Sequence, residues 1–233
     1  MHEIPVVTID GPSGTGKGTI CGYLARWLGW HLLDSGALYR VVAYVAQTTQ
    51  VGLDDAEGLA RIAASLDVSF HVENDEIRAF LENGRRDITP AIRTETCGNA
   101  ASRVAACKPV REALLARQRE FRQLPGLIAD GRDMGTVIFP DAPLKIYLTA
   151  DPEVRAMRRY KQLNEKGISV NLPRLSAEIR ERDARDAGRD ISPLKPAPDA
   201  IVIDTTQLDI DAVCQRVAGE IRKKFPEYPA DTQ

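Results

Sequence analysis

Hydrophobic residues along this chain fall into short runs separated by longer segments with helical periodicity. Five of the runs are rich in apolar and β-branched residues and end at polar or glycine-rich turns, which predicts buried parallel strands at residues 5–10, 30–33, 127–130, 144–148 and 200–204. After the first run, Ile20, Leu24 and Leu28 recur at helical spacing. The alternation predicts an α/β fold with a mostly parallel five-stranded sheet and helices on both faces.

Further helices are expected between and after the later strands. We place them at residues 39–47, at 96–122 with an interruption near Pro109, after Asp151 and Pro152, at 176–187 and at 210–224. The segment from Pro226 onward is expected to be loose.

Residues 66–93 follow a different pattern. Residues 68–72 and 77–81 alternate between apolar and polar side chains, and polar residues at 73–75 and 82–84 indicate turns. This pattern predicts a small antiparallel sheet inserted into the α/β fold.

Composition narrows the range of functions. The 233 residues carry a formal net charge of −2, which provides no overall basic field for a nucleic-acid polymer, so any phosphate binding is expected to be local. The four cysteines form no C-x-x-C pair, which predicts free thiols in a reducing compartment. The first residues lack the layout of a signal peptide, and no apolar run reaches the roughly 18 residues of a membrane span. We therefore expect a cytoplasmic protein, and a monomer, that does not bind membranes.

The first strand and first helix are joined by a phosphate-binding loop. Its residues are Gly11, Pro12, Ser13, Gly14, Thr15, Gly16, Lys17, Gly18 and Thr19. Glycines allow successive backbone N–H groups to turn toward an anion at a helix N-terminus, and a lysine at the seventh position reaches the β- and γ-phosphates of a nucleoside triphosphate. The spacing and the strand–helix context predict ATP or GTP binding.

One position departs from the usual P-loop, because Gly18 stands where a serine or threonine normally binds Mg²⁺. We therefore expect no direct protein ligand to a metal. Thr19 or Ser13 could replace the missing hydroxyl, or the ion could be carried by ATP and held through water. Thr19, Asp34 and Asp130 are the candidates for such indirect contacts.

Two further segments are expected beside the P-loop. Residues 34–40 follow the second strand and residues 130–136 follow the third, and ligands of open α/β sheets bind beyond the carboxyl ends of strands. Arg40 and Arg132 would bring forked donors suited to a phosphate dianion. Asp133 adds a carboxylate to a phosphate-binding cleft.

These motifs together resemble the bacterial cytidylate kinase family. The resemblance rests on K-G-T in the P-loop, L-L-D-S-G-A-x-Y-R, I-A-D-G-R-D-M-G-T-V-x-F-P-D-A and E-R-D-x-R-D, in one order over residues 5–205. It implies a core of residues 1–36, 103–154 and 174–233, a monophosphate-binding insertion of residues 37–102 and a short helical lid of residues 155–173. It also implies ATP with Mg²⁺ as phosphoryl donor and CMP or dCMP as acceptor.

The resemblance assigns roles by position. Ser102, Arg111 and Asp133 would read the cytosine edge, and Arg40, Arg132 and Arg189 would hold the acceptor phosphate. Asp186 and Arg182 would contact the sugar, Ser35 would line the acceptor site, and Arg158 would contact ATP. Lys17, Arg132, Arg182 and Arg189 would surround the transferring group. Uracil offers a carbonyl where cytosine offers an amino group to Asp133, so we expect CMP to be preferred over UMP.

Alternatives remain at this stage. A regulatory GTPase or other nucleotide-binding switch should carry N-K-x-D, which the sequence lacks. A P-loop kinase for another small acceptor, such as UMP or shikimate, is opposed only by the family likeness. Arg155, Arg158 and Arg159 fit either lid contacts to ATP or a solvated helix face.

Overall fold

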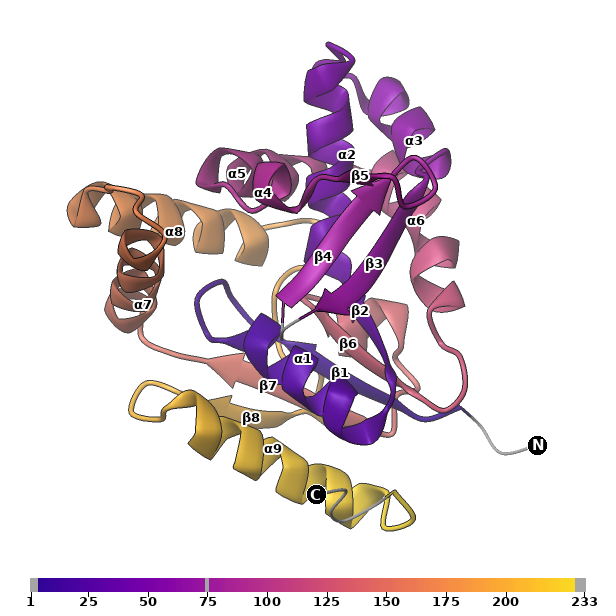
Figure 1. Ribbon diagram of the computed structural model, residues 1–233, viewed down its shortest axis with the longest axis vertical. Coiled ribbons are helices and arrows are strands. Elements are labelled where there is room, and N and C mark those ends of the chain that lie inside the picture. The colour runs from indigo at the N-terminus through magenta and orange to yellow at the C-terminus, as the bar shows by residue number, and fades with distance from the viewer. Residues whose placement is uncertain (1–3, 74–75, 229–233) are drawn as a thin grey trace.

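The computed structural model describes residues 4–73 and 76–228, and a five-stranded parallel sheet lies at its centre (Figure 1). The strand order is β2-β6-β1-β7-β8, and every neighbouring pair is parallel. The strands are β1 (Val6–Asp10), β2 (His31–Asp34), β6 (Leu127–Gly131), β7 (Leu144–Thr149) and β8 (Ile201–Asp204). All five predicted strands are confirmed.

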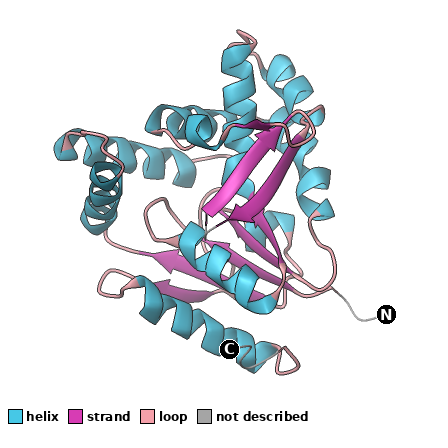
Figure 2. Cartoon of the chain, viewed as in Figure 1, coloured by secondary structure: helices cyan, strands magenta, loops and turns pink. Residues whose placement is uncertain are grey.

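Helices cover both faces of this sheet, as Figure 2 shows. Successive β1 residues point to opposite faces, so Val6 and Val7 belong to different hydrophobic clusters. Val7 packs with α1 (Lys17–Leu28) and α9 (Ile210–Lys224). On the other side, the cluster around Val6 draws on α2 (Ser35–Thr48), α5 (Glu95–Val104) and α6 (Lys108–Glu120).

The inserted segment forms a separate antiparallel sheet at one end of the molecule (Figure 1). It consists of β3 (Val68–Glu73), β4 (Glu76–Leu81) and the short β5 (Arg86–Asp87), with α3 (Ala56–Ala64) before it and α4 (Thr89–Ile92) after it. The predicted pair of strands is confirmed, whereas α3 and β5 were not predicted. The predicted turn at 73–75 falls partly on residues 74–75, which lie outside the described residues.

Two helices begin earlier than the sequence pattern predicts, because a polar side chain caps the N-terminus of each. The helix expected from residue 39 begins at Ser35, because the Asp34 side chain accepts a hydrogen bond from the Ala37 N–H at 2.8 Å. The long helix expected at 96–122 is interrupted as predicted, and Pro109 lies in the first turn of α6. The charged helices are α7 (Pro152–Glu165) and α8 (Leu172–Ala187). Helix α8 is capped by Asn171 and begins at Leu172, four residues before its predicted start at 176.

The C-terminal segment is ordered further than expected. Tyr228 packs edge-on against Trp30, with ring centroids 4.9 Å apart, and its hydroxyl donates to the Pro125 carbonyl at 3.0 Å. The expectation of a loose chain from Pro226 is therefore wrong up to Tyr228, and residues 229–233 lie outside the described part. All four cysteines are free, as predicted. Among the described residues, no helix combines the length and apolar character that crossing a membrane requires.

Candidate active site

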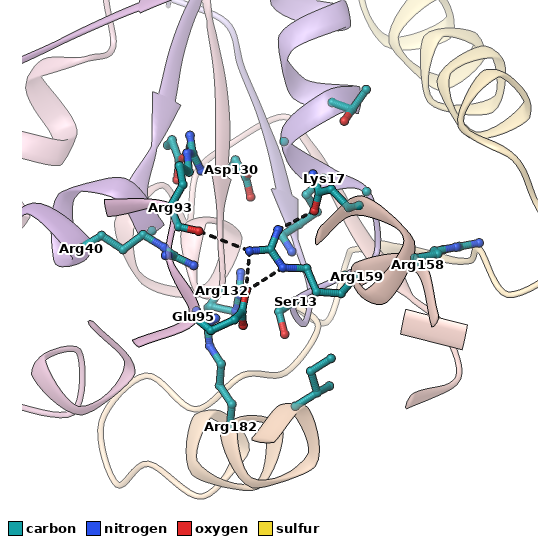
Figure 3. A pocket seen from close by; sticks show the side chains of 18 of the residues that line it. Ser13, Lys17, Arg40, Arg93, Glu95, Asp130, Arg132, Arg158, Arg159 and Arg182 are labelled. Atoms are coloured by element: carbon teal, nitrogen blue, oxygen red, sulfur yellow. Dashed lines mark hydrogen bonds and ion pairs between the residues drawn. The ribbon is translucent and has the colours of Figure 1, made fainter. Parts of the chain in front are cut away.

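A cavity of about 590 Å³ opens beside the P-loop, at the carboxyl ends of the sheet strands (Figure 3). Cationic side chains from the core, the inserted segment and the charged helices line it: Lys17, Arg40, Arg93, Arg132, Arg158, Arg159 and Arg182. Ser13, Gly14, Gly16, Gly18 and Thr19 of the P-loop and the carboxylates Asp34 and Asp130 also line it. This concentration of positive charge is suited to a polyphosphate.

The P-loop backbone depends on its glycines. Gly11 has φ 147°, and a Cβ there would lie 2.1 Å from the Leu148 carbonyl oxygen, so no other residue fits. Lys17 is buried, and its Nζ donates to the Pro12 carbonyl at 2.7 Å. Burial, together with the nearby Arg132, lowers the pKa of Lys17 to about 7.

Asp10, the last residue of β1, fixes the loop that carries Arg132 and Asp133. Its two carboxylate oxygens accept hydrogen bonds from the Met134 and Gly135 N–H groups, each at 2.8 Å. These bonds begin a π-helical turn, η1 (Met134–Ile138), that the sequence pattern did not predict. Burial raises the pKa of Asp10 to about 7 despite the two donors.

Asp186 on α8 gathers the predicted acceptor residues. Its carboxylate accepts from the Ser102 hydroxyl at 2.8 Å and from Arg132 Nε at 3.3 Å, pairs with Arg189, and lies 3.9 Å from Arg182 Nε. Burial alone would raise its pKa, but the three arginines hold the pKa of Asp186 below its usual value. Four residues from α5, α8 and the loops after β6 and α8 thus meet at the Asp186 carboxylate.

Asp133 and Arg111, both predicted to read the base, form a second polar group. They are paired with each other and almost completely buried, and the Arg111 guanidinium lies 5.7 Å from the centre of the Tyr39 ring. Burial raises the pKa of Asp133. These residues line a smaller cavity of about 40 Å³, little more than the volume of one water molecule.

Comparison with known proteins decides the family. The family model for cytidylate kinase matches residues 7–223. The chain belongs to the cytidylate kinase family. It is 59% identical to the cytidylate kinase of Aeromonas salmonicida over 97% of both chains. It is 57% identical to that of Shewanella loihica over 97% of this chain and 98% of the relative, and 57% identical to that of Pseudomonas putida over 94% and 96%.

Other residues that the cytidylate kinase likeness singles out are held by protein contacts. Arg40 donates to the Ile92 and Thr94 carbonyls at 2.5 and 3.0 Å, and its guanidinium faces the large cavity. The Ser35 hydroxyl donates to Gln118 Oε1 at 2.6 Å at the edge of the small cavity. Arg158 donates to the carbonyls of Thr205 and Leu208.

Three site residues were not predicted or were left open by the sequence. Arg93 lines the cavity and pairs with Asp34 at 3.1 Å, although nothing in its local sequence marks it. Arg155, open between a lid role and solvation, is buried and donates to the Ser13 carbonyl at 3.1 Å and to Asp183 at 2.6 Å. Arg155 therefore holds the P-loop in place through the Ser13 carbonyl. The third residue, Asp10, could have been noticed as an acid that closes an apolar strand.

The oxygen donors of the cavity suit a magnesium ion carried by a nucleotide. Among the described residues there is no group of three or more His, Cys, Asp or Glu side chains arranged to hold a metal. The Thr19 hydroxyl is exposed, and Asp130 faces the cavity beside Lys17, with a pKa raised to about 6 by burial. Hard oxygen ligands and a largely water- and phosphate-held ion are the usual arrangement for Mg²⁺. The residues present therefore fit the group.

Proposed function

We propose that this member of the cytidylate kinase family transfers the γ-phosphoryl group of ATP to CMP or dCMP, giving ADP and CDP or dCDP. The observation that carries the proposal is that the P-loop cavity adjoins the smaller cavity lined by Asp133, Arg111 and Asp186, with Arg132 and Arg182 lining both. A GTPase-type switch and a kinase for another acceptor are not favoured, because family membership and the base-reading set point to cytidylate.

The donor triphosphate lies along the P-loop in this proposal. Backbone N–H groups of residues 13–19 bind the phosphates, and Lys17 moves from the Pro12 carbonyl to the β- and γ-phosphates. Arg158, on α7, lies toward the nucleoside end. Thr19, Asp34 and Asp130, which line the cavity, would hold Mg²⁺ through water, and the ion would neutralise charge on the phosphates.

The acceptor base is read by the buried pair. Asp133 accepts from the cytosine amino group, while Arg111 and Ser102 donate to the ring nitrogen and carbonyl. Asp186 and Arg182 contact the sugar. Arg40, Arg132 and Arg189 bind the phosphate. To make room for the base, Asp133 and Arg111 move apart. Part of the ion pair between them is then replaced by hydrogen bonds to cytosine.

The transfer itself needs positioning and charge neutralisation. The attacking oxygen of the monophosphate is already anionic, so no general base is required, and the transition state is loose and nearly in line. Lys17, Arg132, Arg182 and Arg189 surround the transferring group and stabilise its charge. We assign residues 37–102 to the monophosphate-binding insertion and 155–173 to the lid, whose closure would exclude water. The core is then residues 1–36, 103–154 and 174–233. A monomer in the cytoplasm stays a prediction.

The test is a coupled ADP-release assay with ATP, Mg²⁺ and each of CMP, dCMP, UMP and AMP. We expect rapid turnover with CMP and dCMP and slow turnover with the other two. Similar rates with UMP or AMP would contradict the base-reading assignment while leaving a nucleotide kinase. A lack of acceptor-dependent turnover would overturn the proposed function.

A further inference from the structure

A carboxylate stands in the wall of the phosphate cavity, where a negative charge opposes the expected ligand. Glu95, the first residue of α5, lines the 590 Å³ cavity together with the seven cationic side chains. The other acids at the wall include two that cap helices: Asp34 accepts from Ala37 N and Asp209 from Ala212 N. Thr94 caps α5, so Glu95 is not needed for that task.

The partner of Glu95 is an arginine on a different part of the chain. Arg159 of α7 donates through Nε to Glu95 Oε1 at 2.6 Å, and its Nη2 also pairs with that oxygen. The same guanidinium donates to the Arg93 carbonyl at 3.3 Å and to Gln162. Figure 3 shows Arg159 held in this way between α7 and the segment carrying Arg93 and Glu95. The Arg159 side chain is 23% exposed and the Glu95 side chain 29%, so water screens their ion pair only in part.

We propose that Glu95 is a positioning residue. Its carboxylate holds Arg159 at the cavity wall when no nucleotide is bound, and Arg159 leaves Glu95 to pair with the phosphates when ATP binds. A triphosphate in the cavity competes with the carboxylate for the same guanidinium donors, because both are oxygen anions suited to a fork of N–H groups. Part of the binding free energy of ATP then goes into breaking the Glu95–Arg159 pair. When ADP leaves, Glu95 recaptures Arg159 and favours product release.

The inference rests on the proposed function only in taking ATP as the ligand. Its test is therefore a direct measurement of ATP binding without acceptor, by isothermal titration of the full chain. Glu95→Gln keeps the shape of the side chain and removes its charge. We expect ATP to bind about three- to fivefold more tightly, the range of a partly exposed ion pair. In turnover assays, KM for ATP and kcat should both fall, whereas simple damage to the fold would raise KM.

Two further variants separate this role from a general effect of charge. Glu153→Gln removes a carboxylate of α7 that pairs with Arg180 outside the cavity and is 65% exposed, and we expect ATP binding to stay unchanged. In an Arg159→Ala background, Glu95→Gln should give no gain, because its partner is absent. An equal gain in that background, or unchanged or weaker ATP binding by Glu95→Gln itself, would overturn the proposal. Failure of CMP turnover with these binding results intact would overturn only the proposed acceptor.

Discussion

At the scale of single residues, burial shifts the pKa values of the charged groups that line the cleft. Lys17 is the clearest case, because burial and Arg132 hold its pKa at about 7 in the ligand-free protein. A triphosphate beside Nζ favours the ammonium and raises this pKa. Between pH 7 and the higher pKa of the complex, the free protein lacks a proton that the complex holds. ATP binding therefore takes up a proton, and ATP affinity falls as the pH rises above 7.

Proton uptake can be measured by titrating ATP at pH 8 in buffers of different ionisation enthalpy. Lys17→Arg is the matched variant, because a guanidinium stays charged at this pH. We expect clear uptake in the natural protein and less in the variant. Equal uptake in both would assign the proton to another group, such as Asp10, whose pKa is also raised to about 7.

Asp133 carries the residue-scale prediction for specificity. Replacement by alanine removes the proposed acceptor for the cytosine amino group and leaves Arg111 buried without its partner. We expect the preference for CMP over UMP, of the order of 10⁴ for a site built on buried hydrogen bonds, to fall by at least about 100-fold. The ratio of kcat/KM values measures it. Asp141→Ala breaks another arginine pair, at the exposed partner of Arg122, and should leave the ratio unchanged.

At the scale of elements, the sequence best predicted the strands and helices that are marked by apolar residues in their own segment. The central strands β1 and β6 are buried throughout and read as continuous apolar runs, and the partly exposed edge strands β2 and β8 still contain short apolar runs, so all five were recognised. The start of α2 was missed because Asp34, Ser35 and Gly36 look like a turn until the Asp34 cap is seen. The two-residue strand β5 was missed because it exists only by pairing with β4. Helix α3 buries only a few side chains, which leaves a weak periodic signal.

One position in α5 shows how an element sets the site. A Cβ at Gly98 would lie 2.8 Å from Nη2 of Arg40, so the helix leaves room there for that guanidinium. Alanine favours a helix by about 1 kcal/mol, and Arg40 can move, so Gly98→Ala should change the free energy of unfolding by no more than about 1 kcal/mol. KM for CMP should rise about tenfold.

The control for this element is Gly219→Ala in α9, where a Cβ would meet nothing within 4 Å. It should stabilise the protein by up to about 1 kcal/mol and leave KM for CMP unchanged. Urea unfolding and initial rates measure both quantities. An unchanged KM in Gly98→Ala would show that the position of Arg40 is not set by the space above α5.

At the scale of the whole molecule, the site is assembled from distant segments. Ser102 and Asp186 are 84 residues apart in the chain and share a hydrogen bond, and Arg111 and Asp133 approach from a helix and a loop. Hydrophobic periodicity alone contains no information about such meetings. The P-loop could be found because its residues are contiguous, and Arg40, Arg132 and Asp133 because they follow predicted strands. The roles of Ser102, Arg111 and Asp186 came only from the family resemblance. Asp10, Arg93 and Glu95 were missed because their roles depend on tertiary neighbours.

Arg155 joins three parts of this assembly. It is 3% exposed and ties the first turn of α7 to the P-loop through the Ser13 carbonyl, to β7 through the Ala150 carbonyl and to α8 through Asp183. A lysine has no guanidinium fork and cannot make all three contacts at once. Arg155→Lys should therefore lower the free energy of unfolding by about 1–3 kcal/mol and raise KM for ATP, because Ser13 loses its support.

The matched control is Arg180→Lys, whose side chain is 60% exposed and pairs with Glu153 between the same two helices. An exposed pair of this kind contributes about 0–1 kcal/mol, and the lysine preserves its charge, so both stability and KM for ATP should hardly change. If Arg155→Lys lowers stability without raising KM for ATP, then the helices are held by Arg155 but the P-loop is not. If Arg155→Lys both lowers the free energy of unfolding and raises KM for ATP, then Arg155 couples the packing of α7 and α8 to the position of the phosphate-binding loop.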